Sequence, residues 1–210
     1  MVSNPTRIVT KCAIIVNKLY TITPEILNPL LDSQKLVALY KRFYRLRLFR
    51  NNKYDRINYT AALRRRFTTH RIELRRDIFL KESKNPLLFS QIIERAVNTL
   101  AFVQNASLYR PSEPEENLGD SDRQIPTQES KLLSTILRVE AGMPLEVVSD
   151  FTYRWMDKIV NIDDDIESSA ENRSSYKKKF AQKDEIMHYL GYRDYFTNLE
   201  RINERHRLSL

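Results

Sequence analysis

The residues best suited to chemistry in this sequence are basic and aromatic, and they fall in two short runs. Residues 39–45 read Leu-Tyr-Lys-Arg-Phe-Tyr-Arg, and the arginines Arg64, Arg65 and Arg66 are consecutive. Guanidinium and ammonium groups bind carboxylates and phosphates, and aromatic rings beside them can stack on bases. The chemistry that these runs predict is therefore the binding of an anion. An acidic protein, nucleic acid and anionic lipid all meet that condition.

The positive charge of the chain is concentrated around these runs. The 210 residues carry a formal net charge of +8. Residues 35–81 hold 15 Lys and Arg against 3 Asp and Glu, namely Asp55, Glu73 and Asp77. A surplus kept for solubility would be spread along the chain, so this one indicates a localised anionic partner. Because local acids are so few, we expect most of the arginine triplet to meet solvent, the acidic stretch over residues 109–127 or an external anion.

The sequence lacks catalytic and metal-binding signatures. Cys12 is the single cysteine, and His70, His188 and His206 lie far apart, without a neighbouring cluster of ligands. Residues 163–167 are acidic but lack the alternating oxygen ligands and central glycine of a calcium loop. Glycine occurs only 3 times, which disfavours Gly-rich phosphate loops. We therefore predict a protein that is not an enzyme and holds no metal or cofactor of its own.

Helical periodicity positions both basic runs. Apolar residues recur at three- and four-residue steps over residues 33–50, with Ser33 as a plausible cap, and again over residues 56–81. A third helix is expected over residues 85–107, because a cap residue and a proline begin it. Short connections between amphipathic helices favour an antiparallel three-helix bundle. Further helices are expected over residues 130–141, 144–160 and 176–190, the last ending at Gly191, and a short one reaching Leu208.

The expected organisation is all-α, with four segments. Residues 1–32 form an amino-terminal arm, residues 33–108 a basic three-helix bundle, residues 109–128 an acidic linker with prolines, and residues 129–210 a carboxyl-terminal helical region. The arm contains no acid before residue 25. That composition is compatible with a mitochondrial targeting segment and equally with an ordinary arm of the domain. No run of 18 apolar residues predicts a membrane span.

Residues 39–45 resemble the signature of the LYR-motif family, small mitochondrial proteins with a Leu-Tyr-Arg sequence in their first helix; here Lys41 takes the third position. Residues 63–67 and 92–100 resemble that family's second and third helices. The resemblance implies an adaptor that grips mitochondrial acyl carrier protein, whose acyl-phosphopantetheine would enter the bundle. It assigns partner binding to Tyr40, Lys41, Arg42, Arg45, Arg64, Arg65 and Arg66, and the lining of the acyl chain or core to Leu39, Phe43 and Phe67.

The chain as a whole resembles the fungal increased recombination centers protein 19 family. The likeness is carried by residues 39–46, residues 63–80 and the run Ala-Val-Asn-Thr-Leu-Ala-Phe-Val at 96–103, together with the chain length and residues 196–210. It implies a part in mitochondrial genome maintenance and in sporulation. With the acid-free segment of residues 1–24, it predicts a protein of the mitochondrial matrix.

The alternative function is direct binding of nucleic acid in DNA maintenance or recombination. In that case the same arginines would neutralise phosphates, while Tyr40, Phe43, Tyr44 and Tyr54 would stack on bases. The burial of Phe43 and Phe67 distinguishes the two functions, because rings inside a bundle cannot stack on bases.

Overall fold

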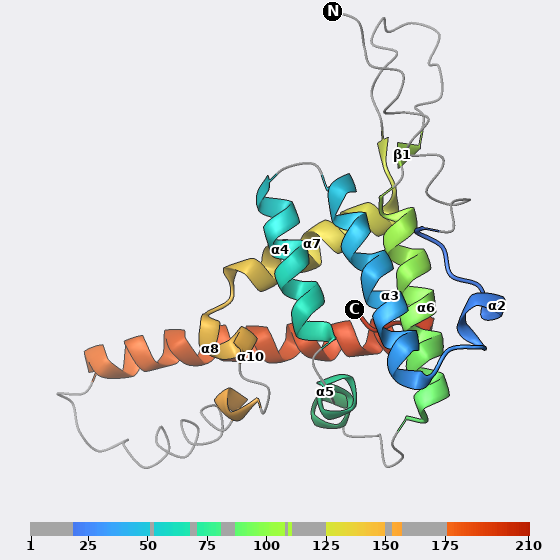
Figure 1. Cartoon of the computed structure of the whole chain (residues 1–210). Coiled ribbons are helices and arrows are strands. Elements are labelled where there is room, and N and C mark those ends of the chain that lie inside the picture. Colours follow the sequence, from blue (N-terminus) through green and yellow to red (C-terminus); the bar gives the residue numbers. More distant parts are fainter. Residues whose placement is uncertain are drawn as a thin grey trace, which may run out of the picture. The chain divides into compact units, whose positions relative to one another are not determined.

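The computed structural model describes residues 19–50, 53–67, 71–80, 87–107, 109–110, 125–149, 153–156 and 176–210 (Figure 1). This part of the chain is built of helices. Its one pairing of strands joins β1 (Tyr109–Arg110) to β2 (Ile125–Pro126) in antiparallel register. The all-α class that the periodicity predicts is therefore confirmed. None of the described helices is long and apolar enough to cross a membrane.

The chain divides into two compact units. The first, the bundle unit, comprises residues 1–69, 87–142 and 207–209, and the second, the α10 unit, comprises residues 70–86, 143–206 and 210. This division differs from the expected one, in which residues 33–108 alone formed the basic bundle. Helix α7 (Gln128–Gly142), which follows the expected linker, packs within the bundle unit. Helix α5 (Arg71–Leu80), expected inside the bundle, packs within the α10 unit.

Four helices build the bundle unit: α3 (Asp32–Leu46), α4 (Lys53–Arg66), α6 (Phe89–Asn105) and α7. Helix α3 packs on α4 and α6, and α7 packs on the same two helices. The short helix α2 (Pro24–Leu27) precedes α3, and the 3-10 turn η1 (Arg47–Phe49) follows it. The three expected helices are thus joined by a fourth. The helix expected over residues 56–81 appears as α4 and α5, which belong to different units.

Contacts at the helix ends fix the directions within the bundle unit. Because η1 leads from the end of α3 to the start of α4, these two helices are antiparallel (Figure 1). Arg50, just after η1 at the carboxyl end of α3, donates a hydrogen bond to the carbonyl oxygen of Ala106, just after α6 (3.0 Å), so α3 and α6 are parallel. The hydroxyl of Thr127, before α7, donates to the carbonyl oxygen of Asn105, the last residue of α6 (3.1 Å). Helix α7 therefore runs antiparallel to α6.

The core of the bundle unit is formed by one apolar stripe from each helix. Leu39, Phe43 and Leu46 of α3 recur every three or four residues, and Leu39 and Leu46 are completely buried. The other helices contribute Tyr59, Ala62 and Leu63 from α4, Ile93, Ala96, Leu100 and Val103 from α6, and Leu133 and Leu137 from α7. Burying one such Leu or Phe side chain stabilises the fold by about 1.5–3 kcal/mol relative to leaving it exposed.

Glutamine side chains stabilise the starts of α3 and α6. The backbone N–H of Leu31 donates to Oε1 of Gln34 (3.1 Å), and that of Leu88 donates to Oε1 of Gln91 (3.0 Å). In both helices the third helical residue reaches back and satisfies a backbone donor at the helix start. The expected cap at Ser33 is wrong, because Ser33 lies inside the first turn of α3.

The α10 unit is organised on one long helix, α10 (Tyr176–His206), which packs on α5. Helix α8 (Leu145–Ser149) and the 3-10 turn η2 (Arg154–Met156) belong to the same unit. Aromatic rings form its core, with neighbouring centroids such as those of Phe79 and Phe196 5.3 Å apart. The cluster also includes the rings of Tyr153, Trp155 and Tyr189. Two ion pairs join α5 to α10: Arg75 with Glu200, both buried, and Arg76 with Glu204.

The expected helix end at Gly191 is wrong. Helix α10 runs through this residue to His206, so the two helices expected here are one. A glycine inside a helix costs about 0.5–1 kcal/mol relative to alanine. Tyr189 and Phe196 are buried on either side of Gly191, and the burial of two aromatic rings outweighs that cost. Of the helix expected over residues 144–160, the described part contains α8 and η2.

Candidate functional site

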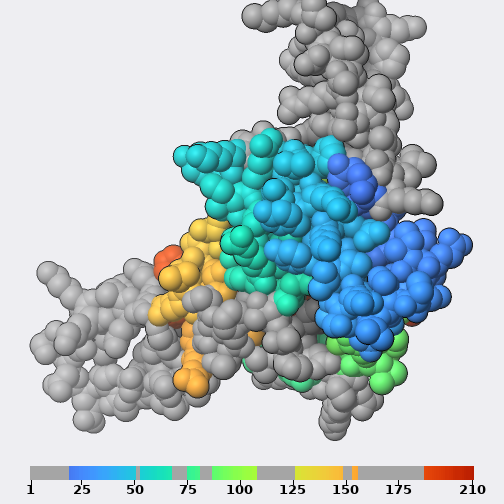
Figure 2. All heavy atoms as spheres, viewed as in Figure 1, coloured from blue at the N-terminus to red at the C-terminus, as the bar shows by residue number. Residues whose placement is uncertain are grey.

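A groove of about 510 Å³ runs along the exposed side of α3, beside the connection from α2. Figure 2 shows α2 and α3, both in blue, at the surface of the face in view. The groove is lined by Leu30, Ser33, Gln34, Val37, Ala38, Lys41, Arg42 and Arg45. The α3 members share one face because residues three and four apart on a helix are neighbours. We call this site the α3 groove.

The α3 groove has an apolar half and a cationic half. Leu30 and Val37 line the first half, and the side chain of Val37 is 52% exposed. Lys41, Arg42 and Arg45 follow along the next two turns of α3 and place three positive charges in the second half. These are three of the residues that the sequence assigns to partner binding. The groove can therefore receive an apolar side chain and an anionic group from one ligand.

Arg42 and Arg45 also bind the chain segment that precedes α2. The Nε of Arg42 donates to the carbonyl oxygen of Thr21 (2.6 Å), and the Nη1 of Arg45 donates to that of Leu19 (3.0 Å). Between them, the carbonyl oxygen of Tyr20 accepts a hydrogen bond from Nε2 of Gln104 in α6 (2.6 Å). Side chains thus hold three consecutive carbonyls, and we call residues 19–21 the strap.

The two guanidiniums of the cationic half repel each other. Burial lowers the pKa of Arg42 from its usual value, and the neighbouring charge of Arg45 lowers this pKa further. Arginine nevertheless stays protonated in proteins. Lys41 is exposed and adds a third charge to the same half. An anion that enters the cationic half therefore relieves a repulsion that already exists in the free protein.

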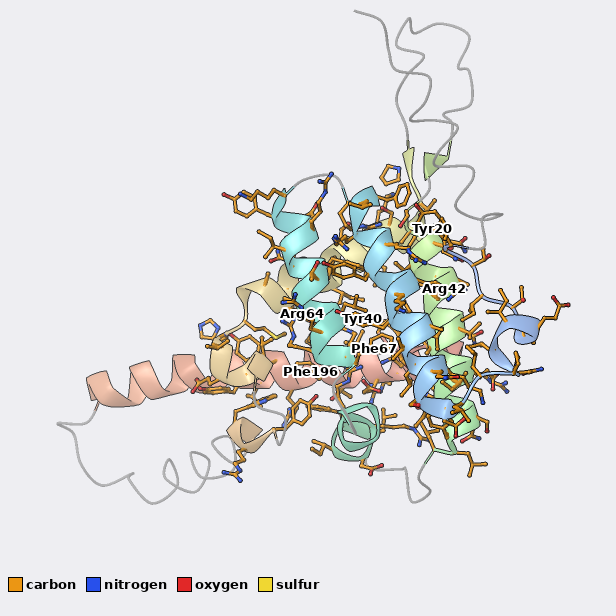
Figure 3. The ribbon with its side chains drawn as sticks, viewed as in Figure 1. Tyr20, Tyr40, Arg42, Arg64, Phe67 and Phe196 are labelled. Carbon is orange, nitrogen blue, oxygen red and sulfur yellow. The ribbon has the colours of Figure 1, made fainter. Side chains whose placement is uncertain are left out.

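The aromatic residues of the predicted site pack on one another between α3 and α4. The ring of Phe67, in the turn after α4, makes T-shaped contacts with the rings of Tyr40 and Phe43, with ring centroids 5.3 Å and 5.7 Å apart (Figure 3). Phe43 is only 4% exposed and Leu39 is completely buried, whereas Phe67 and Tyr40 are half-buried. Leu39 and Phe43 therefore belong to the core of the bundle unit. Phe43 cannot stack on a base in this fold, although the alternative function required it to.

The arginine triplet has an internal partner that sequence reasoning did not find. Arg65 and Arg66 both bind the carboxylate of Glu140 near the end of α7, with N–O distances of 2.8 Å and 2.5 Å. The side chain of Glu140 is 6% exposed. Arg64 is exposed on α4 (Figure 3). The expectation that most of the triplet meets solvent, the acidic segment of residues 109–127 or an outside anion is wrong for Arg65 and Arg66, because both pair with Glu140, which lies 75 and 74 residues further along the chain.

The environment of Glu140 shows how strongly this pair of arginines holds it. Burial alone would raise the pKa of its carboxyl. Two arginines reverse that effect. The charge of Arg66 and its hydrogen bond to the carboxylate, together with the hydrogen bond and charge of Arg65, lower the pKa of Glu140 to about 2. Glu140 had a sequence signal, because it continues the stripe of Leu133, Ile136 and Leu137 on α7. An acid on a buried stripe is rarely found without a cationic partner.

The histidines and acidic residues that the structure describes do not assemble into a metal site. Within the described part of the chain, no group of three or more His, Cys, Asp or Glu side chains could hold a metal ion. His188 and His206 are exposed on α10. His70 and residues 163–167 lie outside the described residues.

Comparison with known proteins identifies the family. No curated protein and no solved structure matches the chain. The family model of increased recombination centres protein 19 matches residues 6–210, which confirms the whole-chain resemblance read from the sequence. The name of that family associates it with recombination and hence with genome maintenance. Because the match covers nearly every residue of both units, the chain belongs to the increased recombination centres protein 19 family.

Proposed function

We propose that this protein is a non-enzymatic adaptor of the mitochondrial matrix that contributes to mitochondrial genome maintenance and sporulation, and that its α3 groove binds an acidic protein partner. The observation that carries this proposal is the cationic half of the groove, formed by Lys41, Arg42 and Arg45 beside an apolar half. Acyl carrier protein is the first partner to test, because the LYR-like sequence at residues 39–45 lies on the helix that forms the groove.

The shape and charge of the groove favour a protein over nucleic acid. Leu30 and Val37 offer an apolar surface to the hydrophobic face of a partner helix, whose acids can reach Lys41 and Arg45. A nucleic acid would make little use of the apolar half.

Direct binding of nucleic acid loses two of its supports in this fold. Phe43 is buried, and Arg65 and Arg66 share the carboxylate of Glu140, so one ring and one net positive charge fewer remain for bases and phosphates. The best remaining surface for nucleic acid is the exposed side of α4, where Tyr54 is 77% exposed next to Lys53. This surface provides the control in the binding experiment.

The proposed docking site predicts different effects for two exposed lysines, Lys41 and Lys53. Lys41→Gln removes a charge from the α3 groove, and Lys53→Gln removes the same charge from α4. Exposed charge pairs contribute about 0.2–1 kcal/mol, so we expect Lys41→Gln to weaken binding of acyl carrier protein about three- to fivefold and to reduce its salt dependence. Lys53→Gln should change the affinity less than about twofold, and neither variant should alter the melting temperature.

The measurement is a salt-titrated binding assay with the full chain, first against acyl carrier protein and then against a DNA duplex. Val37→Glu is a stronger variant, because it places a carboxylate inside the groove at a half-exposed position. It should abolish binding of the acidic partner. Tight DNA binding that is lost with Lys53→Gln and retained with Lys41→Gln would contradict the adaptor function and support the alternative.

The proposed location is tested separately. A fluorescent fusion at the carboxyl terminus is expected to co-localise with mitochondria, and deletion of the gene is expected to impair respiratory growth and to destabilise mitochondrial DNA. A nuclear signal from the intact fusion, with stable mitochondrial DNA in the deletion strain, would contradict this part of the proposal. The binding experiment with purified protein does not depend on the result.

A further inference from the structure

The outer side of α4 carries large apolar side chains that the core does not use. Tyr54 is 77% exposed and Ile57 is 54% exposed. They are three residues apart on the helix and are therefore neighbours on its surface. The residues of α4 that belong to the core of the bundle unit, Tyr59, Ala62 and Leu63, lie on the opposite side of the helix. Figure 2 shows α4, in cyan, at the surface of the face in view.

Positive charges flank these apolar side chains. Lys53, Arg56 and Arg64 are all exposed on α4. Lys53 and Arg64 lie on the same side as Ile57, because residues four and seven apart along a helix share a face. The Nε of Arg56 donates to the carbonyl oxygen of Arg50 (3.3 Å). A carbonyl carries no net charge, so this contact leaves the positive charge of Arg56 in place.

The outer side of α4 contains no acid to balance these charges. Asp55 is the only acid in α4. It lines a small cavity together with Arg50 and Ser134, on the side of the helix that faces α7. The outer side is therefore cationic and apolar at once. We call this surface the α4 face and define it by Lys53, Tyr54, Arg56, Ile57 and Arg64.

This combination matches an anionic lipid surface. Tyrosine is enriched at the headgroup level of bilayers, because its ring is apolar and its hydroxyl is polar. Lysine and arginine can bury their apolar stems there while their charged ends stay with the phosphates. A ring as exposed as that of Tyr54 projects from the protein and can enter a soft lipid layer. Ile57 would gain little from the phosphates of a nucleic acid.

We propose that the α4 face is a membrane-contact surface, on which α4 lies along an anionic phospholipid layer without crossing it. Tyr54 and Ile57 enter the headgroup layer, and the cations of the face bind the lipid phosphates. Because only two large apolar side chains enter the layer, the contact is weak and reversible, and it depends on the anionic lipid. It is separate from the proposed docking site, since Lys53, Tyr54 and Ile57 do not line the α3 groove.

The experiment is a flotation assay with the full chain and two kinds of vesicle. One contains phosphatidylcholine with about one third of anionic phosphatidylglycerol, and the other contains phosphatidylcholine alone. We expect the chain to float with the anionic vesicles only, and to dissociate from them as the salt concentration rises.

A fluorophore that responds to its surroundings locates the contact. Cys12 is the single cysteine, so a label on Tyr54→Cys in a Cys12→Ser background reports from the α4 face alone. Its emission should shift to the blue when anionic vesicles are added. The control label is on Leu88→Cys, at a position that is 67% exposed at the start of α6. Because α6 runs antiparallel to α4, Leu88 lies at the other end of the bundle unit, and its label should not shift.

Two matched pairs of variants separate the α4 face from the general charge of the chain. Lys53→Gln should weaken binding to anionic vesicles about fivefold, as expected for the loss of one charge near the lipid. Lys131→Gln, at an exposed position on α7 behind α4, should change it less than about twofold. Ile57→Gln should weaken binding about three- to tenfold, and Leu88→Gln should not. All four residues are exposed, so the melting temperature should stay unchanged.

Selective losses with Lys53→Gln and Ile57→Gln, together with the shift at position 54, support the membrane contact. It is overturned if the chain does not bind anionic vesicles, or if the label at position 54 keeps its emission in their presence. Equal losses with Lys53→Gln and Lys131→Gln also overturn it, because the attraction would then belong to the charge of the whole chain. Binding to a DNA duplex that depends on Lys53 and not on Ile57, without binding to vesicles, would assign the face to nucleic acid.

Discussion

Replacing Glu140 by Gln is expected to destabilise the protein by about 3 kcal/mol at pH 7. The carboxylate is buried between Arg65 and Arg66, and the variant removes the negative charge that both guanidiniums share. Removing one partner of a buried ion pair is strongly destabilising, by about 3–5 kcal/mol where both partners are fully buried. The side chains of Arg65 and Arg66 are 22% and 17% exposed, so water reduces the effect toward the lower end. Denaturant unfolding of the wild type and of Glu140→Gln measures this loss of unfolding free energy.

The same residue predicts a pH dependence. The pKa of Glu140 is about 2 in the folded protein, against 4.5 for the unperturbed group. Because folding lowers the pKa, the contribution of Glu140 is complete above pH 4.5 and is lost as the pH falls toward 2. The unfolding free energy of the wild type should therefore fall more steeply across this interval than that of Glu140→Gln. The matched control is Glu129→Gln on the same helix, expected to stay within about 0.5 kcal/mol of wild type. Equal stabilities of the two variants would show that the pair with the arginines is not structural.

The second large effect is expected from Phe43→Ala. Phe43 is 4% exposed in the core of the bundle unit, and removing a buried aromatic ring costs about 3–5 kcal/mol. Phe67→Ala removes the ring that packs against it, but Phe67 is only half-buried and lies in the turn after α4. Its loss should cost about 1–2 kcal/mol, in proportion to the smaller area buried. Thermal melts show which variant loses more stability. A larger loss of stability for Phe67→Ala than for Phe43→Ala would contradict the placement of these rings.

Local periodicity predicted the individual helices well. The expected helices over residues 33–50, 85–107 and 130–141 correspond to α3 with η1, to α6 and to α7, with ends that differ by a few residues. An apolar stripe of this kind lies within one helix, so the spacing of apolar residues in that segment of the sequence is enough to reveal it. The end of α10 was placed wrongly at Gly191, because the packing of Tyr189 and Phe196 overrides the weak local preference of one glycine.

The assembly of the helices was less predictable, because it depends on contacts between distant residues. Nothing near residues 64–66 indicates that Arg65 meets Glu140, 75 residues away, and this contact joins α7 to the bundle. The cationic half of the groove could be predicted from the sequence, since Lys41, Arg42 and Arg45 lie in one short run. The apolar half of the groove was not predicted, because Leu30 and Val37 look like ordinary surface residues until α2 and α3 are placed together. The strap was missed for the same reason, since backbone carbonyls carry no sequence signal.

The claim that the α3 groove is the docking site is tested most directly by the position of the bound partner. A photoreactive amino acid at position 37, inside the groove, and at position 54, on the exposed side of α4, gives two matched probes at exposed sites. With purified acyl carrier protein and a DNA duplex present together, the probe at position 37 is predicted to crosslink the acidic protein and the probe at position 54 to crosslink neither. Crosslinks to DNA from position 54, with none to the acidic protein from position 37, would contradict the claim.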